Sequence, residues 1–184
     1  MNYATIKKTD VANGPGVRVS LFVSGCTHYC KGCFNSEAWD FGYGNLYTES
    51  VEEEILAALE PSYIRGLSVL GGEPFEAANR PEVLRLLKKA KERFPEKTIW
   101  CYTGYDYEQD LQRWIQDGSE EVDEMLGCID VLVDGEFVEE LKNLKLPFRG
   151  SENQRLIDVP ASRSGGQIVC ISFSETGTRI EVLQ

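Results

Sequence analysis

The sequence lacks long apolar runs, basic tracts and internal repeats, and these absences exclude several classes of protein. No apolar run exceeds a few residues, so we expect no membrane-spanning helix and no membrane partner. The opening residues, MNYATIKKTDVANG, have no apolar signal segment, which predicts a cytoplasmic location. No basic run is longer than Lys88-Lys89, and the formal net charge is −11. We therefore expect no nucleic-acid partner, because phosphate binding depends on clustered Lys and Arg.

Histidine is also scarce, and the cysteines are unevenly distributed. His28 is the single histidine among 184 residues, and no second C-x2-C pair of the kind common in structural zinc sites is present. Three of the six cysteines are expected to act as small buried hydrophobic residues, because they are far apart in apolar segments: Cys101, Cys128 and Cys170. The other three crowd together as C-x3-C-x2-C: Cys26, Cys30 and Cys33. In a cytoplasmic protein this crowding indicates metal binding before disulfide formation.

The hydrophobic pattern predicts an α/β fold in a single domain, residues 1–184. Apolar residues alternate over residues 17–24, the period of a half-buried strand, and the crowded cysteines follow its carboxyl end. Three more strands are each followed by a glycine-bearing turn and a helix-like segment: residues 66–70, 98–102 and 129–133. Such alternation indicates βα units and a mostly parallel sheet.

Four helical segments are expected after the cysteine loop. The first has Ser50 as its N-cap, with Glu53 completing a capping box, and Pro61 lies just beyond its end. The second begins near Pro81 and ends at Pro95. The remaining two cover about residues 106–117 and 119–126.

The pattern changes after Gly150. Residues 154–159 predict a strand, and residues 162–167 predict a flexible turn. Residues 167–173 and 178–183, separated by a Glu-Thr-Gly turn, predict a C-terminal β-hairpin. We therefore expect a core of about residues 1–156 and a short β extension over about residues 157–184.

The cysteine loop is compatible with three kinds of metal site. A zinc site would need a fourth ligand, and His28 lies too close to Cys26 and Cys30 in sequence for easy tetrahedral binding. A ferredoxin-type cluster would need a fourth thiolate, which Cys101 or Cys128 could supply. The third kind is a cubane bound by three thiolates with one iron open, and an open position marks a catalytic metal site. The spacing favours this kind over zinc because, although zinc sites are commoner, this spacing suits them badly.

The C-x3-C-x2-C spacing after a first strand resembles the signature of the radical S-adenosylmethionine superfamily. The resemblance implies an open partial (β/α) barrel and a [4Fe–4S] cluster on Cys26, Cys30 and Cys33, whose open iron binds S-adenosylmethionine. The run Gly71-Gly72-Glu73-Pro74 follows the next strand. Its glycines allow close approach of a ligand, and its carboxylate can accept hydrogen bonds from an ammonium group. In isolation the run would be better interpreted as a strand-to-helix turn, but here it follows the next strand after a cysteine loop, and in this superfamily the motif contacts the methionyl amino group.

A narrower resemblance covers about residues 1–156. It rests on Trp39 and on six segments, which are NGPG at 13–16, FVSGC at 22–26, CKGCFN at 30–35, WCYTGY at 100–105, VLVDG at 131–135 and RGSENQ at 149–154. These resemble the activating enzymes of anaerobic ribonucleoside-triphosphate reductases. The resemblance implies cleavage of S-adenosylmethionine to a 5′-deoxyadenosyl radical, which generates a glycyl radical on that reductase. It also implies a one-electron donor such as a flavodoxin, and possible homodimers.

The resemblance assigns further residues to the cofactor, and one position departs from the superfamily. An aromatic residue between the second and third cysteines commonly packs on the adenine, but Gly32 stands there. Phe34 could supply the ring instead, or belong to the core, and Gly32 would offer its backbone. Thr103 could touch the cofactor or serve as a turn residue. His28 is expected to face solvent or donate a hydrogen bond near the cluster.

Aromatic residues near the cysteines could form a rim for a protein partner, since aromatics favour interfaces. These are Trp39, Phe41 and Tyr43, although core packing is the better expectation for Trp39. The segments at 134–135 and 149–154 could contact cofactor or partner, or form structural turns. The rival functions are activation of another glycyl-radical enzyme, chemistry on a small molecule, and a non-catalytic zinc or iron–sulfur module.

Overall fold

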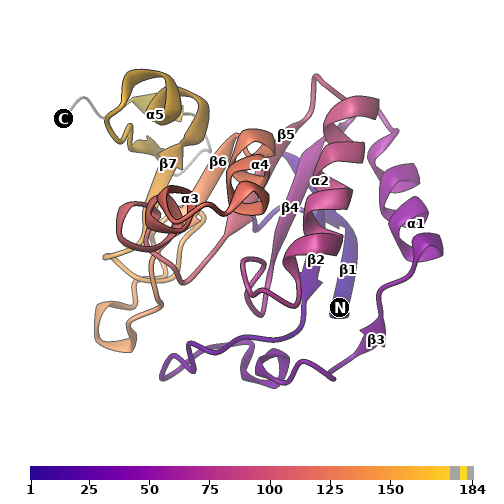
Figure 1. Ribbon diagram of the computed structural model, residues 1–184, viewed down its shortest axis with the longest axis horizontal. Helices are drawn as coiled ribbons and strands as arrows, with labels where there is room; N and C mark the ends of the chain where they lie inside the picture. The colour runs from indigo at the N-terminus through magenta and orange to yellow at the C-terminus, as the bar shows by residue number, and fades with distance from the viewer. Residues whose placement is uncertain (175–178, 182–184) are drawn as a thin grey trace.

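The structure of the protein is a computed structural model that describes residues 1–174 and 179–181. One seven-stranded sheet has the order β3-β1-β2-β4-β5-β6-β7 (Figure 1). Its strands are β1 (Asn2–Asp10), β2 (Val17–Val23), β3 (Asn45–Leu46), β4 (Ile64–Gly71), β5 (Thr98–Tyr102), β6 (Val131–Asp134) and β7 (Arg155–Asp158). The helices are α1 (Glu49–Leu59), α2 (Arg80–Arg93), α3 (Arg113–Gln116), α4 (Glu120–Cys128) and α5 (Val159–Gly165). Shorter helical turns are η1 (Ser36–Trp39), η2 (Tyr107–Gln112, a π-helix) and η3 (Glu139–Leu141).

The expected open partial barrel with a mostly parallel sheet is wrong, although the protein is α/β overall. The sheet is mixed: β2, β4, β5 and β6 are parallel, but β1 pairs antiparallel with both β2 and β3, and β7 pairs antiparallel with β6. Strand β1 was missed because its residues are polar and mostly exposed or half-buried. An antiparallel neighbour needs no crossover helix. The chain therefore adds β1 and β7 on either side of the parallel centre.

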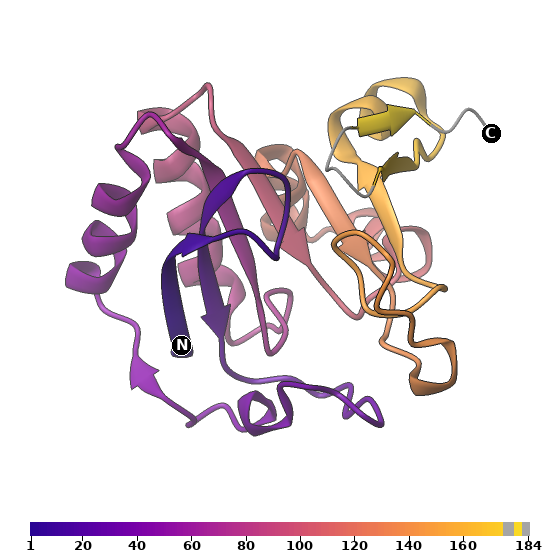
Figure 2. The same cartoon turned by 180° about the vertical axis from the view of Figure 1, so that it is seen from behind.

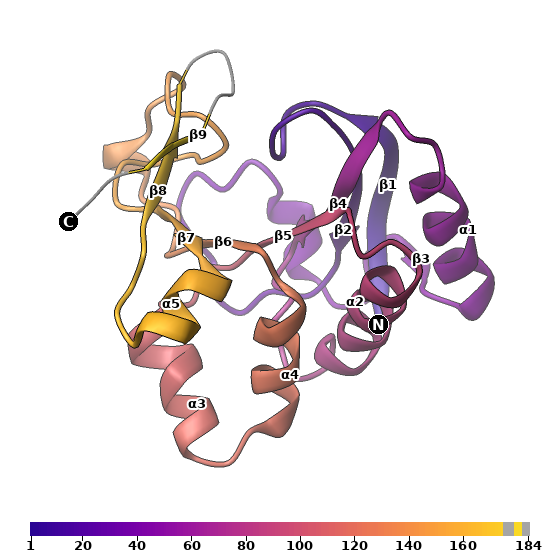
Figure 3. The same cartoon turned by 90° about the horizontal axis from the view of Figure 1, so that it is seen from above.

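The helices gather along one side of the sheet, as Figure 3 shows. They cover it because each has one apolar face, and the largest hydrophobic core joins α1, α2 and α4 to β2, β4, β5 and β6. The first helix differs from expectation at its start. Its N-cap is Thr48, whose hydroxyl accepts a hydrogen bond from the Val51 amide, whereas Ser50 lies inside the helix.

The second face of the sheet is partly polar, and one buried cation connects its strands. Strand β2 is buried on both faces, so the expectation of a half-buried strand is wrong. Arg18 is fully buried and donates to Ser68 Oγ at 2.7 Å and to the Thr98 carbonyl at 2.8 Å. Ser68 in turn donates to the Asn13 carbonyl at 2.6 Å. The turn before β2 is thus anchored to β4 and β5.

The C-terminal part differs from its prediction in one segment. Residues 162–167 were expected to form a turn, but Val159–Gly165 form α5, because the Asp158 carboxylate caps the Ala161 amide at 2.9 Å. Strands β8 (Ile171–Phe173) and β9 (Arg179–Glu181) pair antiparallel. The expected turn at residues 175–177 lies outside the described residues. In the described ranges, no helix has the length and apolar character needed to cross a membrane.

Candidate functional site

A cavity of about 130 Å³ lies where the carboxyl ends of β2, β4, β5 and β6 meet. We call it the cysteine cavity. The cysteine loop and the 135–154 connection lie at the same edge of the sheet, which Figure 2 shows from behind. Eight of the ten predicted site residues line the cavity: Cys26, Cys30, Cys33, Phe34, Gly71, Gly72, Glu73 and Thr103. Gly32 lines the neighbouring cavity instead, and Pro74 is buried and lines neither.

Backbone hydrogen bonds tie the start of the cysteine loop to the Gly-Gly-Glu-Pro turn. The Glu73 amide donates to the Gly25 carbonyl at 2.8 Å, and the Gly72 amide donates to the Val23 carbonyl at 2.7 Å. A Cβ on Gly72 would lie 2.6 Å from the Gly25 carbonyl oxygen, which is closer than any tolerated contact. A glycine is therefore required here by the approach of protein backbone, independently of any ligand.

Asn79 holds the same junction from the side. Its Nδ2 donates to the Ser24 carbonyl at 3.0 Å and to the Glu73 carbonyl at 2.9 Å, and the residue is 1% exposed. It lies directly before α2, where its side chain makes no capping bond. The role of Asn79 was not predictable from its sequence position, since an asparagine before a helix suggests an ordinary N-cap.

The buried Glu73 carboxylate has four protein partners. Its Oε1 accepts from the Phe75 amide at 2.8 Å and from Thr103 Oγ1 at 2.9 Å. Its Oε2 accepts from the Gly104 amide at 2.7 Å and lies 3.1 Å from His28 Nε2. A carboxylate offers about four acceptor sites. Glu73 thus binds the end of β5 and the cysteine loop to its own turn.

His28 points inward, so of its two expected roles the structure fits a hydrogen-bonding side chain near the cysteines and not a solvent-facing one. Its side chain is 9% exposed and packs edge-on against Tyr105 at 4.4 Å between ring centroids. Its Nδ1 lies 3.0 Å from Glu136 Oε1, opposite the contact with Glu73. Burial lowers the pKa of His28, but the hydrogen bonds and charges of Glu73 and Glu136 outweigh it and raise the pKa to about 9.

The cysteines themselves differ in exposure. Cys26 is buried, and burial raises the pKa of its thiol to about 12. Cys30 and Cys33 are half-buried. All six cysteines lie in the described part of the chain, and none forms a disulfide. The other three do not line the cavity, which excludes Cys101 and Cys128 as a fourth ligand in this arrangement.

The distances between the donor atoms show whether a site suits a single metal ion or a cluster. Within residues 1–174 and 179–181, just one group places three potential ligand atoms within 4.8 Å of one another, and the cysteines do not belong to it. A zinc ion would draw its sulfur ligands inside that distance, because each Zn–S bond is about 2.3 Å. A four-iron cluster binds each thiolate to a different iron and suits wider spacing. The three cysteines therefore fit a cluster better than zinc.

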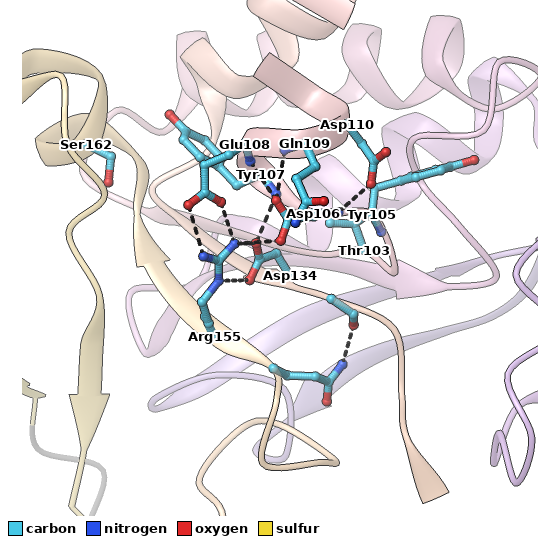
Figure 4. Close-up of polar contacts among 12 residues, drawn as sticks. Thr103, Tyr105, Asp106, Tyr107, Glu108, Gln109, Asp110, Asp134, Arg155 and Ser162 are labelled. Atoms are coloured by element: carbon cyan, nitrogen blue, oxygen red, sulfur yellow. Dashed lines mark hydrogen bonds and ion pairs between the residues drawn. The ribbon is translucent and has the colours of Figure 1, made fainter. Parts of the chain in front are cut away.

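The described group that does meet this distance consists of three carboxylates, and an arginine side chain already lies among them. Figure 4 shows Arg155 among the carboxylates of Asp106, Glu108 and Asp134. Arg155 Nη2 lies 2.7 Å from Glu108 Oε2 and 3.2 Å from Asp106 Oδ2, and it also pairs with Asp134. Asp134 further accepts from the Tyr107 amide at 3.0 Å. These carboxylates therefore fix β6, β7 and the start of η2, and Asp134 has a structural role.

A second, larger cavity of about 410 Å³ adjoins the first, and we call it the apolar cavity. The two share six lining residues: Cys33, Phe34, Leu70, Tyr102, Phe137 and Gln154. Gly32 lines the apolar cavity with a φ of +75°, and a Cβ there would lie 2.8 Å from Glu139 Oε1. Its backbone conformation explains why an aromatic residue is absent at this position.

Comparison with known proteins identifies the family. Residues 12–157 match the family described as a 4Fe-4S single cluster domain. The anaerobic ribonucleoside-triphosphate reductase-activating protein of Enterobacteria phage T4 is 44% identical over 156 residues, which cover 85% of this chain and 93% of the phage protein. This chain belongs to the family of anaerobic ribonucleoside-triphosphate reductase-activating proteins. Members from Vibrio cholerae and Escherichia coli K12 are 44% and 38% identical over 156 residues, covering 84% of this chain and 96% of each relative.

The family match agrees with the resemblance seen in the sequence and leaves the C-terminal segment outside it. The matched range ends at residue 157, just before α5, β8 and β9. The sequence missed four wall residues of the cysteine cavity, Leu70, Tyr102, Gly104 and Phe137. Gly104 was discoverable, because it lies just beyond the end of β5 as Gly72 lies just beyond the end of β4, but its close approach to His28 depends on the fold.

Proposed function

We propose that this protein activates an anaerobic ribonucleoside-triphosphate reductase by cleaving S-adenosylmethionine at a [4Fe–4S] cluster on Cys26, Cys30 and Cys33. One observation carries the proposal: three cysteines, without a fourth, share a cavity with the Gly-Gly-Glu-Pro turn. When bound, the cluster would supply the electron that cleaves the cofactor, and the 5′-deoxyadenosyl radical so formed would take a hydrogen atom from a glycine of the reductase. The printed names of the relatives support the reductase as partner.

Different residues of the chain would bind the cluster and the methionyl end of the cofactor. Cys26 anchors the cluster at the buried end of the loop, while Cys30 and Cys33 are nearer to solvent. Gly71 and Gly72 offer backbone to the methionyl end of the cofactor. Glu73 contributes its negative charge and holds the turn, because its acceptor sites are already used by protein donors.

The adenine side of the cofactor is assigned to the boundary of the two cavities. Phe34 lines both and is 87% exposed, so its ring face is available for stacking. Gly32 would lie beside it with open backbone. Thr103 acts through Glu73, to which its hydroxyl donates. An electron donor such as a flavodoxin would complete the reaction, since the chain's described residues include no second group of cysteines.

The deciding experiment uses the full chain reconstituted with iron and sulfide under anaerobic conditions. We expect strong reductant to produce methionine and 5′-deoxyadenosine from S-adenosylmethionine, and EPR to detect a glycyl radical when the reductase is added. A non-catalytic module would give neither product. Products without a radical on this reductase would favour another glycyl-radical enzyme or a small-molecule substrate.

Matched cysteine variants test the ligand assignment in the same assay. Cys30→Ala should lose the absorbance of the four-iron cluster and abolish cleavage. Cys170→Ala should retain both, because Cys170 does not line the cavity. Equal losses in the two variants would count against the assignment.

A further inference from the structure

The apolar cavity has two large apolar side chains in contact with solvent at its wall. Leu144 is 90% exposed and Phe34 is 87% exposed, and both line the cavity. They come from different parts of the chain, since Phe34 follows the last cysteine and Leu144 lies after η3. Exposed apolar residues grouped around a hollow mark a surface that another molecule covers.

Two residues that line the same cavity each carry a buried polar atom without a partner in the described part of the chain. The Tyr102 hydroxyl and Arg149 Nε are inaccessible to solvent and have no hydrogen-bond partner among the described residues. Burial raises the pKa of Tyr102, so its hydroxyl stays protonated and can donate. A buried unpaired donor costs about 1–3 kcal/mol. A ligand with acceptor oxygens at these points would recover that cost.

Arg149 is held in place by its neighbours. Its Nη1 donates to the Gln154 carbonyl at 2.5 Å, and Gln154 Oε1 accepts from the Gly150 amide at 2.8 Å. Gln154 Nε2 also donates to the Gly135 carbonyl at 3.0 Å. Since Gln154 lines both cavities, this network places Arg149 beside the cysteine cavity in a fixed orientation.

The charge of the wall differs from that of the protein. The chain carries 30 acidic and 19 basic residues. The described residues that line the apolar cavity include Lys142 and Arg149 but no Asp or Glu. The cavity therefore favours a ligand with carbonyl or anionic oxygens among apolar groups, which is the chemistry of an extended peptide.

We propose that the apolar cavity receives an extended segment of the reductase, whose main-chain carbonyls accept hydrogen bonds from Tyr102 and Arg149 while its side chains pack on Leu144 and Phe34. This inference rests on the proposed function and adds the site of docking. The shared wall at Cys33 and Phe34 would bring the bound segment next to the cofactor. A cofactor bound between the two cavities would not contact Leu144, which lines the apolar cavity alone. A protein partner on the apolar cavity would cover it.

The test measures binding of the purified reductase to the full, cluster-loaded chain. Leu144→Asp places a charge on the proposed surface, and because Leu144 is highly exposed the substitution should leave the fold intact. Leu46→Asp is the matched control, because Leu46 is 66% exposed on β3, outside both cavities. Tyr102→Phe removes the hydroxyl alone.

We expect Leu144→Asp to raise the Kd for the reductase at least tenfold and Tyr102→Phe to raise it about threefold. The Kd for S-adenosylmethionine, and its cleavage without reductase, should stay within twofold of wild type for Leu144→Asp. Leu46→Asp should match wild type in each assay. An unchanged Kd for the reductase in Leu144→Asp would overturn the proposal, as would equal losses in Leu46→Asp.

The same experiment separates the two proposals. If Leu144→Asp weakened S-adenosylmethionine as strongly as reductase, the cavity would belong to the cofactor and the docking proposal would fail. If the wild-type chain cleaved no S-adenosylmethionine, the proposed function would fail. Binding of the reductase to the wild type and to Leu144→Asp could still be compared without the cofactor.

Discussion

The Glu73 carboxylate lies 3.1 Å from His28 Nε2. This contact joins the turn after β4 to the middle of the cysteine loop, between the first two cysteines. Because Glu73 also accepts from Thr103 and from the Gly104 amide, one side chain sets the relative position of three segments. The geometry of the loop therefore depends on a residue outside it.

Replacing Glu73 should destabilise the fold itself. Glu73→Ala leaves buried donors of Phe75, Thr103 and Gly104 without their acceptor, and we expect a loss of about 3 kcal/mol in the free energy of unfolding. Urea denaturation of the cluster-free chain measures this loss. Glu54→Ala is the control, because its exposed pair with Lys8 should contribute less than about 1 kcal/mol. Similar losses in both variants would contradict this role.

Two glycines should respond oppositely to alanine. In Gly72→Ala the new Cβ meets the backbone oxygens of Gly25 and Ala38, at 2.6 and 2.9 Å, so we expect a loss of about 2 kcal/mol. In Gly127→Ala, inside α4, the Cβ meets no described atom within 4 Å, so we expect a gain of about 0.5–1 kcal/mol. Thermal unfolding of the two variants would show Tm shifts of opposite sign. An unchanged or higher Tm in Gly72→Ala would show that the contact is not limiting, and a lower Tm in Gly127→Ala would contradict the gain expected there.

Asp10 should contribute stability that disappears in acid. Burial raises the pKa of its carboxyl, but hydrogen bonds from Ser20, Asn13 and the Ala12 amide outweigh burial and lower it below 3.8. A carboxylate with a lowered pKa stabilises the fold above the unfolded pKa of about 3.9 and loses that effect as pH falls through the folded pKa.

Asp10→Asn tests this directly. We expect the variant to be about 1–2 kcal/mol less stable than wild type from pH 5 to 7, and the difference to shrink below about pH 4. Urea denaturation at several pH values measures the difference. A gap that stayed constant down to pH 3 would contradict the assignment.

Arg155 should prevent cation binding by its three carboxylate partners. Arg155→Ala leaves Asp106, Glu108 and Asp134 facing one another, which we expect to cost about 3 kcal/mol of stability. Millimolar Ca²⁺ should then raise the Tm of the variant, since clustered carboxylates bind hard cations. Wild type and Arg113→Ala, which removes an exposed pair with Asp117, should show no such rise.

The sequence predicted the parallel centre of the sheet, because its strands are short apolar runs followed by glycine turns. It missed β1, whose residues 2–10 are polar on the side that faces solvent. It also placed the first helix cap at Ser50, although Thr48 precedes the helix and its hydroxyl can reach the Val51 amide. Local sequence patterns predicted the buried strands at the centre of the sheet. They failed at β1, near the edge of the sheet, where pairing with other strands decides the structure, and at the start of the first helix.

The candidate site shows the same division. The three cysteines and the Gly-Gly-Glu-Pro turn were recognisable because their spacing is local. Asn79, by contrast, acts on Ser24 across 55 positions of sequence. His28 was expected either to face solvent or to donate a hydrogen bond, and its partners, Glu73 and Glu136, are 45 and 108 positions away. Contacts between residues this far apart in the sequence cannot be predicted from a local pattern.

The hydrogen bond from Asn79 to the Ser24 carbonyl also bears on the order of assembly. Because Asn79 directly precedes α2, this bond can form only when the start of α2 lies against the end of β2, so the base of the cysteine loop depends on that packing. Cys26, Cys30 and Cys33 lie outside the main hydrophobic core of the described residues. Zinc fingers, whose metal supplies the folding energy, behave differently. We therefore expect the polypeptide to fold without iron, so that iron and sulfide would enter a loop that the apoprotein has already formed.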